Sequence, residues 1–177
     1  MLVLVVGPSG AGKDTLLDGA RAALGGDPAF VFARREITRP AEAGSEDHDP
    51  VDAAQFAARE AAGGYALTWR AHGLAYGIPA DITHDLALDR TVVANVSRAV
   101  LDAARARFGD VRVLVVTADP ETLARRLSQR GRESAEDIAQ RLARAEAIPV
   151  TGDDVVVVQN DSTPQEGVAR FLAALRR

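Results

Sequence analysis

The stretch LVLVVGPSGAGKDTLL, residues 2–17, constrains the fold more than any other part of the chain. Its five apolar residues Leu2–Val6 predict a buried β-strand, and apolar residues at helical spacing predict a helix over residues 14–24. Between them, Gly7 and Gly12 bracket four residues and Lys13 follows, which is the spacing of a phosphate-binding loop. Such a loop directs backbone N–H groups and a helix N-terminus at an anion. A glycine-rich turn with an incidental lysine is the weaker alternative, because a strand precedes the loop and a helix follows it.

Lys13 is the only lysine among 21 basic residues, and the other 20 are arginines. A drift in composition would produce the same bias. A compact ammonium on a flexible stem, however, reaches between terminal phosphates where a planar guanidinium does not. We therefore predict that Lys13 bridges the β- and γ-phosphates of a nucleoside triphosphate. The loop residues predicted to bind the triphosphate are Gly7, Pro8, Ser9, Gly10, Ala11, Gly12, Lys13, Asp14 and Thr15.

Asp14 stands where the usual loop pattern has Ser or Thr, the hydroxyl of which binds Mg²⁺. Two metal sites are compatible with the sequence. The Thr15 hydroxyl could bind the ion directly or through water, or the Asp14 carboxylate could hold a hydrated Mg²⁺. Asp14 could also only favour the start of the helix through its negative charge. The sequence leaves these alternatives open.

The rest of the chain alternates short apolar runs with amphipathic stretches. Strands are predicted over residues 30–35, 91–97, 111–118 and 154–160, and helices over residues 97–108, 120–129, 134–146 and 164–175. Continuous apolar strands separated by helices predict a parallel sheet covered on both faces. The expected class is α/β, a doubly wound P-loop fold.

Residues 34–76 break this rhythm, because they are richer in glycine, charge and aromatic side chains. They contain one predicted helix, over residues 53–62, and one predicted strand, over residues 65–71. We interpret them as an inserted lobe. The expected organisation is a single domain over residues 1–177, with a core of residues 1–33, 77–129 and 147–177, an acceptor-binding lobe of residues 34–76 and a helical lid of residues 130–146.

Composition excludes several classes of function. A net charge of −4 argues against a general nucleic-acid-binding surface, and the absence of cysteine excludes disulfides and thiolate metal sites. The apolar opening is too short for a signal peptide, and no run is long enough to span a bilayer. We expect a cytoplasmic protein without nucleic-acid or membrane partners. Whether it forms a homodimer stays open.

Five motifs make the prediction more specific. They are REITRP at residues 35–40, GSEDH at 44–48, YALTWRAHGLAYGIP at 65–79, VVANVSRAV at 92–100 and RLSQRGRESAEDIAQRLARA at 126–145. Their succession resembles the guanylate-kinase-like group and, within it, the ribose 1,5-bisphosphate phosphokinases of bacterial phosphonate breakdown. The resemblance covers nearly the whole chain. It implies ATP- and Mg²⁺-dependent phosphorylation of the 1-phosphate of ribose 1,5-bisphosphate, giving 5-phosphoribosyl 1-diphosphate (PRPP) and ADP.

Two departures from guanylate kinases bear on the substrate. Leu67 stands where those enzymes carry the glutamate that reads guanine, and Arg35 stands at the position of a small serine that contacts the base. A leucine cannot accept a hydrogen bond from guanine, so discrimination for a base would be lost. This favours a sugar phosphate over the first alternative, a nucleoside monophosphate kinase. The second alternative, a non-catalytic binding module, is disfavoured by Lys13, Arg132 and Arg141.

The resemblance also implies an acceptor site and a lid. Arginine forks match phosphate oxygens, and acidic or histidine side chains can bind sugar hydroxyls. The predicted acceptor residues are Arg35, Arg39, Glu46, Asp47, His48, Arg70, His72, Tyr76, Ser97, Arg98 and Arg144. In the lid, Arg130 is expected to contact ATP, and Arg132 and Arg141 to stabilise the transferring phosphoryl group. An ion pair between Asp137 and Arg141 is the plain alternative. No general base is expected, because the attacking phosphate oxygen is already deprotonated near neutral pH.

Overall fold

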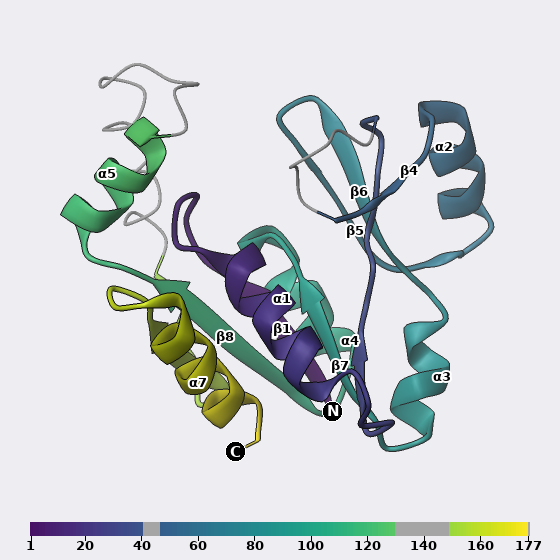
Figure 1. The fold of residues 1–177 in the computed structure, drawn as a ribbon. Coiled ribbons are helices and arrows are strands. Elements are labelled where there is room, and N and C mark those ends of the chain that lie inside the picture. Colours follow the sequence, from purple (N-terminus) through teal and green to yellow (C-terminus); the bar gives the residue numbers. More distant parts are fainter. Residues whose placement is uncertain (41–46, 130–148, 177) are drawn as a thin grey trace. The chain divides into compact units, whose positions relative to one another are not determined.

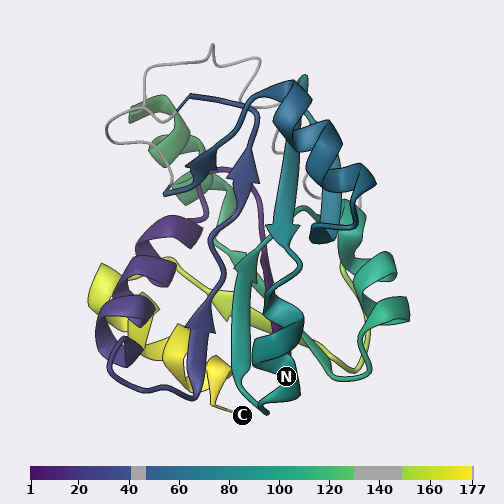
Figure 2. The same cartoon turned by 90° about the vertical axis from the view of Figure 1, so that its right-hand side faces the viewer.

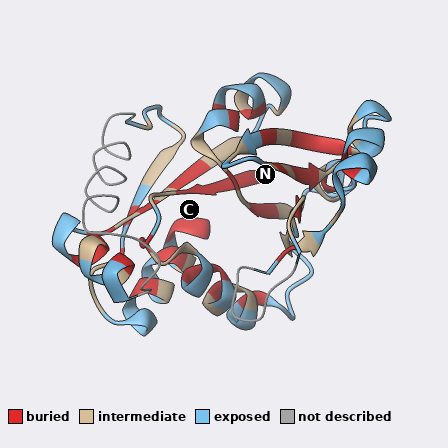
Figure 3. Ribbon diagram, turned by 90° about the horizontal axis from the view of Figure 1, so that it is seen from above, coloured by how far each residue is buried: buried red, intermediate tan, exposed pale blue. Residues whose placement is uncertain are grey.

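The computed structural model of the protein describes residues 1–40, 47–129 and 149–176. A five-stranded sheet has the strand order β2-β7-β1-β8-β9 (Figure 1). Its strands are β1 (Leu2–Val6), β2 (Phe30–Phe32), β7 (Thr91–Asn95), β8 (Val111–Thr117) and β9 (Val155–Gln159). The pairs β2–β7 and β8–β9 are parallel. All five residues of β1 are buried, and Figure 3 shows that buried residues concentrate on the strands. The predicted α/β class is confirmed.

The described helices follow the predicted ones, except for an additional helix over residues 82–87. They are α1 (Lys13–Leu24), α2 (Ala53–Ala61), α3 (Ile82–Ala87), α4 (Leu101–Arg107), α5 (Pro120–Gln129) and α7 (Pro164–Leu175). One predicted helix, over residues 97–108, differs at its start, where a 3₁₀ turn (Arg98–Val100) precedes α4. There the Ser97 hydroxyl accepts a hydrogen bond from Ala99 N at 3.3 Å and caps the turn. The helix predicted over residues 134–146 lies outside the described residues.

Two compact units make up the chain. The first unit comprises residues 1–4 and 26–111, and the second comprises residues 5–25 and 112–177. In the second unit, α1 packs against α7, and α7 packs against β9 (Figure 1). Among the described helices, none has both the length and the apolar character needed to cross a membrane.

The first unit also contains a second sheet, with strand order β4-β3-β6-β5. Its strands are β3 (Glu36–Ile37), β4 (Asp49–Pro50), β5 (Tyr65–Ala71) and β6 (Leu74–Pro79). Helix α2 covers one face of this sheet (Figure 2). There, Phe56 of α2 stacks on Tyr65 of β5 with a centroid separation of 4.6 Å. Only β5 was predicted. Strands β3 and β4 have two residues each, which is too short to show the alternation of apolar and polar residues that predicts a strand. The glycine and proline of β6 argue against a strand in the sequence.

Candidate active site

The loop between β1 and α1, residues 7–12, lies in the second unit and packs closely against neighbouring strands and side chains. Gly12 has a φ of 85°, and a Cβ there would lie 2.6 Å from the Asn160 amide nitrogen. A Cβ on Gly7 would collide with the carbonyl of Val116 on β8. A side chain at either position would therefore displace the loop or its neighbours. These two glycines explain why the loop can lie directly on the ends of the strands.

Lys13 begins α1, and its ammonium is held against the loop. Its Nζ donates to the carbonyl of Gly7 at 2.9 Å and to that of Pro8 at 3.1 Å. The charge therefore lies at the helix N-terminus, where the helix dipole and unpaired N–H groups favour an anion. This is the arrangement required to bind the terminal phosphates of a nucleotide.

Asn160 is a site residue that the sequence analysis missed. It follows β9, is only 4% exposed and donates from its backbone N to Thr117 O at 2.8 Å. Its side-chain nitrogen donates to Ala11 O at 2.7 Å, which fixes the loop to the end of β9. Its position directly after a predicted strand could have indicated this role, because polar residues at the carboxyl ends of parallel strands commonly line ligand sites.

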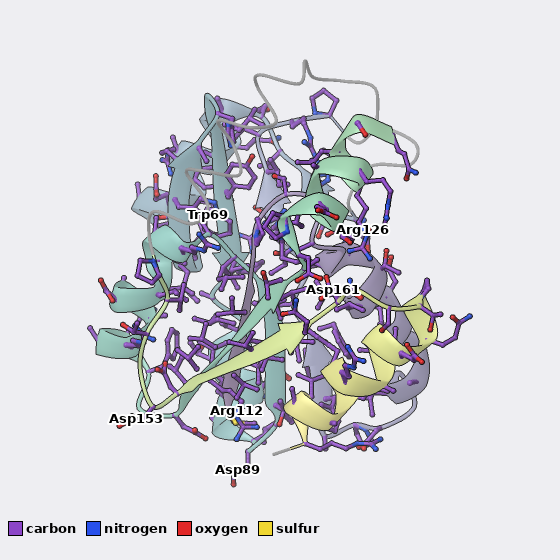
Figure 4. All side chains as sticks on the ribbon, turned by 90° about the vertical axis from the view of Figure 1, so that its left-hand side faces the viewer. Trp69, Asp89, Arg112, Arg126, Asp153 and Asp161 are labelled. Atoms are coloured by element: carbon purple, nitrogen blue, oxygen red, sulfur yellow. The ribbon has the colours of Figure 1, made fainter. Side chains whose placement is uncertain are left out.

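A cleft of about 320 Å³ opens beside the loop, entirely within the second unit. It is lined by Gly10, Gly12, Thr15, Arg126, Gln129, Asn160, Ser162 and Pro164. Arg126 reaches it from α5 (Figure 4), and its Nη1 donates to Gly10 O at 3.5 Å. The Ser162 hydroxyl oxygen is buried and has no hydrogen-bond partner among the described residues. The cleft therefore offers polar groups next to an anion site, as a nucleotide requires.

The start of α5 is fixed to the loop that follows β9. Asp119 N donates to the carboxylate of Asp161 at 2.6 Å, and Figure 4 labels Asp161 at this position. The side chain of Gln159 also donates to Asp161. These bonds hold the helix that carries Arg126, so the cleft wall is built from both chain segments.

The two predicted metal ligands differ in position. Thr15 lines the cleft, whereas Asp14 is exposed in the first turn of α1 and is not among the cleft's lining residues. In the described part of the chain, no cluster of three or more His, Cys, Asp or Glu could hold a metal. Thr15, at the edge of the cleft, is thus the predicted ligand whose position fits a hydrated Mg²⁺ there.

In the first unit, an arginine lies over two aromatic rings on one face of the second sheet. Trp69 and Tyr76 stack with centroids 5.2 Å apart and an interplanar angle of 6°. The Arg35 guanidinium carbon lies 5.4 Å from the Tyr76 centroid and 5.9 Å from that of Trp69. Its Nη1 donates to Asn95 O, at the end of β7, at 3.2 Å. The structure thus brings two predicted acceptor residues, Arg35 and Tyr76, together with Trp69 on the face opposite α2.

Arg39 and His48 are linked at the other end of β3. His48 is 2% exposed, and its Nε2 lies 3.1 Å from Arg39 O. The Arg39 Nε is buried and has no hydrogen-bond partner within the residues that the structure describes. The buried ring therefore supports the Arg39 backbone. Asp47 pairs with Arg34 at 2.9 Å, and both side chains are about half exposed.

Arg70 and His72 lie away from the Trp69–Tyr76 face. Arg70 follows Trp69 in β5 and so points to the opposite face, where it pairs with Glu60 at 2.6 Å and lies over Phe56. The hydrogen bond from Arg70 lowers the pKa of the Glu60 carboxyl. His72 is exposed in the β5–β6 turn with a φ of 52°.

The remaining predicted acceptor residues on the first unit are Ser97 and Arg98. Ser97 caps the 3₁₀ turn, and that turn packs against β5. Burial lowers the pKa of the Arg98 guanidinium. Five predicted residues lie outside the described part of the chain: Glu46, Arg130, Arg132, Arg141 and Arg144.

Comparison with solved structures identifies the fold. A guanylate kinase from Anaplasma phagocytophilum aligns with a TM-score of 0.65 and 20% identity, over 99% of this chain and 84% of that one. A gluconokinase from Sinorhizobium meliloti aligns with a TM-score of 0.56 and 20% identity, over 99% and 91% of the two chains. The profile of a family described as AAA domain matches residues 3–148. The fold is therefore the guanylate-kinase-like P-loop fold.

Several curated proteins are similar over nearly the whole chain. The ribose 1,5-bisphosphate phosphokinase PhnN of Acidiphilium cryptum is 54% identical, over 99% of this chain and 92% of that protein. Its namesake from Methylobacterium radiotolerans is 51% identical, over 99% and 97%. A bifunctional ribose 1,5-bisphosphokinase-thymidine phosphorylase of Azorhizobium caulinodans is 50% identical, and the chain spans 25% of its length. The chain belongs to the ribose 1,5-bisphosphate phosphokinase family.

Proposed function

We propose that the protein transfers the γ-phosphoryl group of ATP to the 1-phosphate of ribose 1,5-bisphosphate, giving PRPP and ADP. The observation that carries this proposal is the 54% identity to the ribose 1,5-bisphosphate phosphokinase PhnN of Acidiphilium cryptum, over 92% of the length of that protein. The donor site supports it independently. The loop holds Lys13 at a helix N-terminus beside a polar cleft, which suits a triphosphate and its nucleoside.

The acceptor face supports a sugar phosphate over a nucleoside monophosphate. Leu67 lies on the same face as Trp69 and Tyr76 and is 5% exposed. It offers neither a donor nor an acceptor to a base. Arg35 and Arg39 provide planar forks for phosphate oxygens. A face with cationic forks and an apolar floor suits an acceptor with phosphate groups and no base.

The reaction needs no proton transfer. An oxygen of the 1-phosphate attacks the γ-phosphorus, the bond from that phosphorus to the β–γ bridging oxygen breaks, and ADP leaves with the electron pair. The barrier comes from charge repulsion and alignment, so fixed positive groups supply the catalysis. Lys13 is assigned to the β- and γ-phosphates. Arg132 and Arg141, outside the described residues, stay predicted as lid arginines that stabilise the transferring group.

Mg²⁺ is part of the proposal. When bound, it neutralises charge on the triphosphate oxygens, and Thr15 is the protein group that fits it on the cleft side of α1. Asp14 stays the alternative ligand through water. The cytoplasmic location expected from the sequence stays a proposal.

The division into core, lobe and lid is likewise a proposal. The four strands of the second sheet and α2 lie between residues 36 and 79, which supports an inserted acceptor lobe close to residues 34–76. Residues 130–146 are assigned to the lid from the resemblance alone. ATP and a small sugar phosphate are the proposed partners, and a homodimer stays open.

The test is ADP release from ATP and Mg²⁺ with ribose 1,5-bisphosphate or GMP as acceptor. We expect turnover with the sugar bisphosphate alone and formation of PRPP. Lys13→Ala should lower kcat by about 100- to 1000-fold, because one fixed charge on the transferring phosphates is lost. Arg21→Ala, on the exposed side of α1, is the matched control and should leave kcat unchanged. Turnover with GMP would favour a nucleoside monophosphate kinase, and no turnover with either acceptor would favour a binding module.

A further inference from the structure

The side-chain amide of Asn160 fills a space that two glycines leave open. A Cβ on Gly12 would lie 2.6 Å from its Nδ2, and a Cβ on Gly167 of α7 would lie 2.4 Å from its Oδ1. The nitrogen end of the amide therefore faces the phosphate loop, and the oxygen end faces α7. Asn160 is 4% exposed, and its backbone N donates to Thr117 O at 2.8 Å. The side chain thus starts from a fixed position at the end of β9.

This amide holds the peptide bond between Ala11 and Gly12. Its Nδ2 donates to Ala11 O at 2.7 Å, and both partners are buried. In a planar trans peptide the C=O and N–H groups point in opposite directions. Because Ala11 O is turned towards Asn160, the Gly12 N–H is turned away from it. Among the described residues this N–H has no backbone acceptor, and Gly12 lines the cleft at the N-terminus of α1, where N–H groups bind anions.

The contact requires a hydrogen-bond donor at residue 160, and not merely a side chain of this size. An aspartate has the same shape, but its ionised carboxylate accepts hydrogen bonds and donates none. It would set one acceptor against another at Ala11 O and turn that carbonyl away. A leucine has a similar size and offers no hydrogen bond. A donor is therefore what fixes the orientation of the Ala11–Gly12 peptide.

We propose that Asn160 is a positioning residue for nucleotide binding, because its amide orients the Ala11–Gly12 peptide so that the Gly12 N–H faces the phosphates. This inference rests on the proposed function only for the nucleotide as the ligand of the loop. All of its parts lie within the second unit. The contact sets the affinity of the folded protein for a nucleotide, in addition to any contribution to stability.

ADP binding, measured by calorimetry at pH 8 and pH 5, tests the assignment. At pH 8, Asn160→Leu and Asn160→Asp should each raise the Kd of ADP about 10- to 100-fold, the effect of losing one hydrogen bond to a charged group. At pH 5 the Kd of Asn160→Asp, divided by that of the intact protein, should fall at least about fivefold, because burial favours the protonated carboxyl, which can donate to Ala11 O. The ratio for Asn160→Leu should be the same at both pH values.

The matched controls are Gln165→Leu and Gln165→Glu, which change an exposed amide in the first turn of α7 and should alter the Kd less than about twofold. Thermal melts show whether each variant folds, and if Asn160→Leu does not, the two pH values for Asn160→Asp decide alone.

An unchanged Kd in folded Asn160→Leu, or a ratio for Asn160→Asp that does not fall towards pH 5, would overturn the assignment. Should the intact protein bind ADP but not phosphorylate ribose 1,5-bisphosphate, the proposed function fails while the Kd values still decide the role of Asn160. Absence of ADP binding by the intact protein would overturn both.

Discussion

At the scale of single residues, Gly12 shows how the phosphate loop and the sheet constrain each other. Its φ of 85° lies in the left-handed region, and the space that a Cβ would need is taken by the Asn160 amide. That amide in turn holds Ala11 O at 2.7 Å. A side chain at residue 12 therefore affects the loop conformation and the Asn160 contact together.

We predict that Gly12→Ala lowers the free energy of unfolding by about 1–3 kcal/mol, the usual cost of a strained backbone position. The same change should weaken ADP binding, because the loop N–H groups move. Urea unfolding and calorimetry measure the two effects. Gly26→Ala is the control, since a Cβ there meets nothing within 4 Å. Equal stability of the two variants would contradict the role of Gly12.

Single residues also illustrate what local sequence misses. Glu36 lies between Arg35 and Arg39 in the sequence, and the local pattern predicts an ordinary solvent-exposed charge. In the structure, however, Glu36 is only 6% exposed. Arg59 of α2 forms an ion pair with it, and the Tyr65 hydroxyl donates to its second oxygen. Residues 23 and 29 positions away supply these partners. Nothing in the local pattern indicates that they meet.

At the scale of elements, the buried Glu36 carboxylate helps to hold α2 on the second sheet through its contact with Arg59 of that helix. The N-terminus of α2 has a capping box formed by Asp52 and Gln55, so the helix is well defined locally. Its attachment depends on Phe56 stacking on Tyr65 and on the contacts of Glu36 with Arg59 and Tyr65. Burial and the adjacent Glu36 carboxylate raise the pKa of the Tyr65 hydroxyl.

The Tyr65 shift predicts loss of stability at alkaline pH. In the unfolded chain a tyrosine ionises near pH 10, whereas in the fold Tyr65 stays protonated to higher pH. Above about pH 10 the folded state therefore binds more protons than the unfolded state. The free energy of unfolding should fall as pH rises, by up to about 1.4 kcal/mol per pH unit.

Tyr65→Phe should remove most of this slope. It should also lower stability near neutral pH by about 1–3 kcal/mol, because Glu36 loses a hydrogen bond. Thermal melts between pH 8 and 11 measure both effects. Only two tyrosines and one lysine are present, so few other groups titrate in this range. An unchanged alkaline slope in the variant would contradict the assignment.

Elements differed in how well they could be predicted. Helices α5 and α7 begin and end at the predicted residues, because each starts with proline and has a clear apolar period. The strand predicted over residues 30–35 ends at Phe32, and the chain then enters β3 of the second sheet. Such a change of sheet depends on pairing with β6, which is more than 35 residues further along.

At the scale of the whole molecule, the two proposed binding sites belong to different compact units. Lys13 and its cleft lie in the second unit, and Arg35 with its aromatic pair lies in the first. The contacts of Lys13 with Gly7 and Pro8 lie within the second unit, and those of Arg35 with Asn95, Trp69 and Tyr76 lie within the first. The affinity of either site for its own ligand should therefore be separable by mutation.

We predict that ADP and ribose 5-phosphate each raise the melting temperature of the intact protein. At about 100 times Kd a ligand adds about 2.7 kcal/mol of stability. Lys13→Ala should lose the shift caused by ADP and keep that caused by ribose 5-phosphate. Arg35→Gln should show the reverse. Differential scanning fluorimetry measures all four combinations, and loss of both shifts in either variant would contradict separate sites.

The sequence by itself determined the α/β class, the phosphate loop, most core helices and the family. These features depend on local periodicity and short motifs, which any segment carries without its neighbours. Tertiary structure alone decided that Asn160 supports Ala11, that Glu36 is buried, and that Arg35 lies over Trp69 and Tyr76 while Arg70 faces α2. Each of these depends on strand register and on contacts between distant parts of the chain. Side-chain alternation places Trp69 and Arg70 on opposite faces, but only the packed sheet shows which face α2 covers.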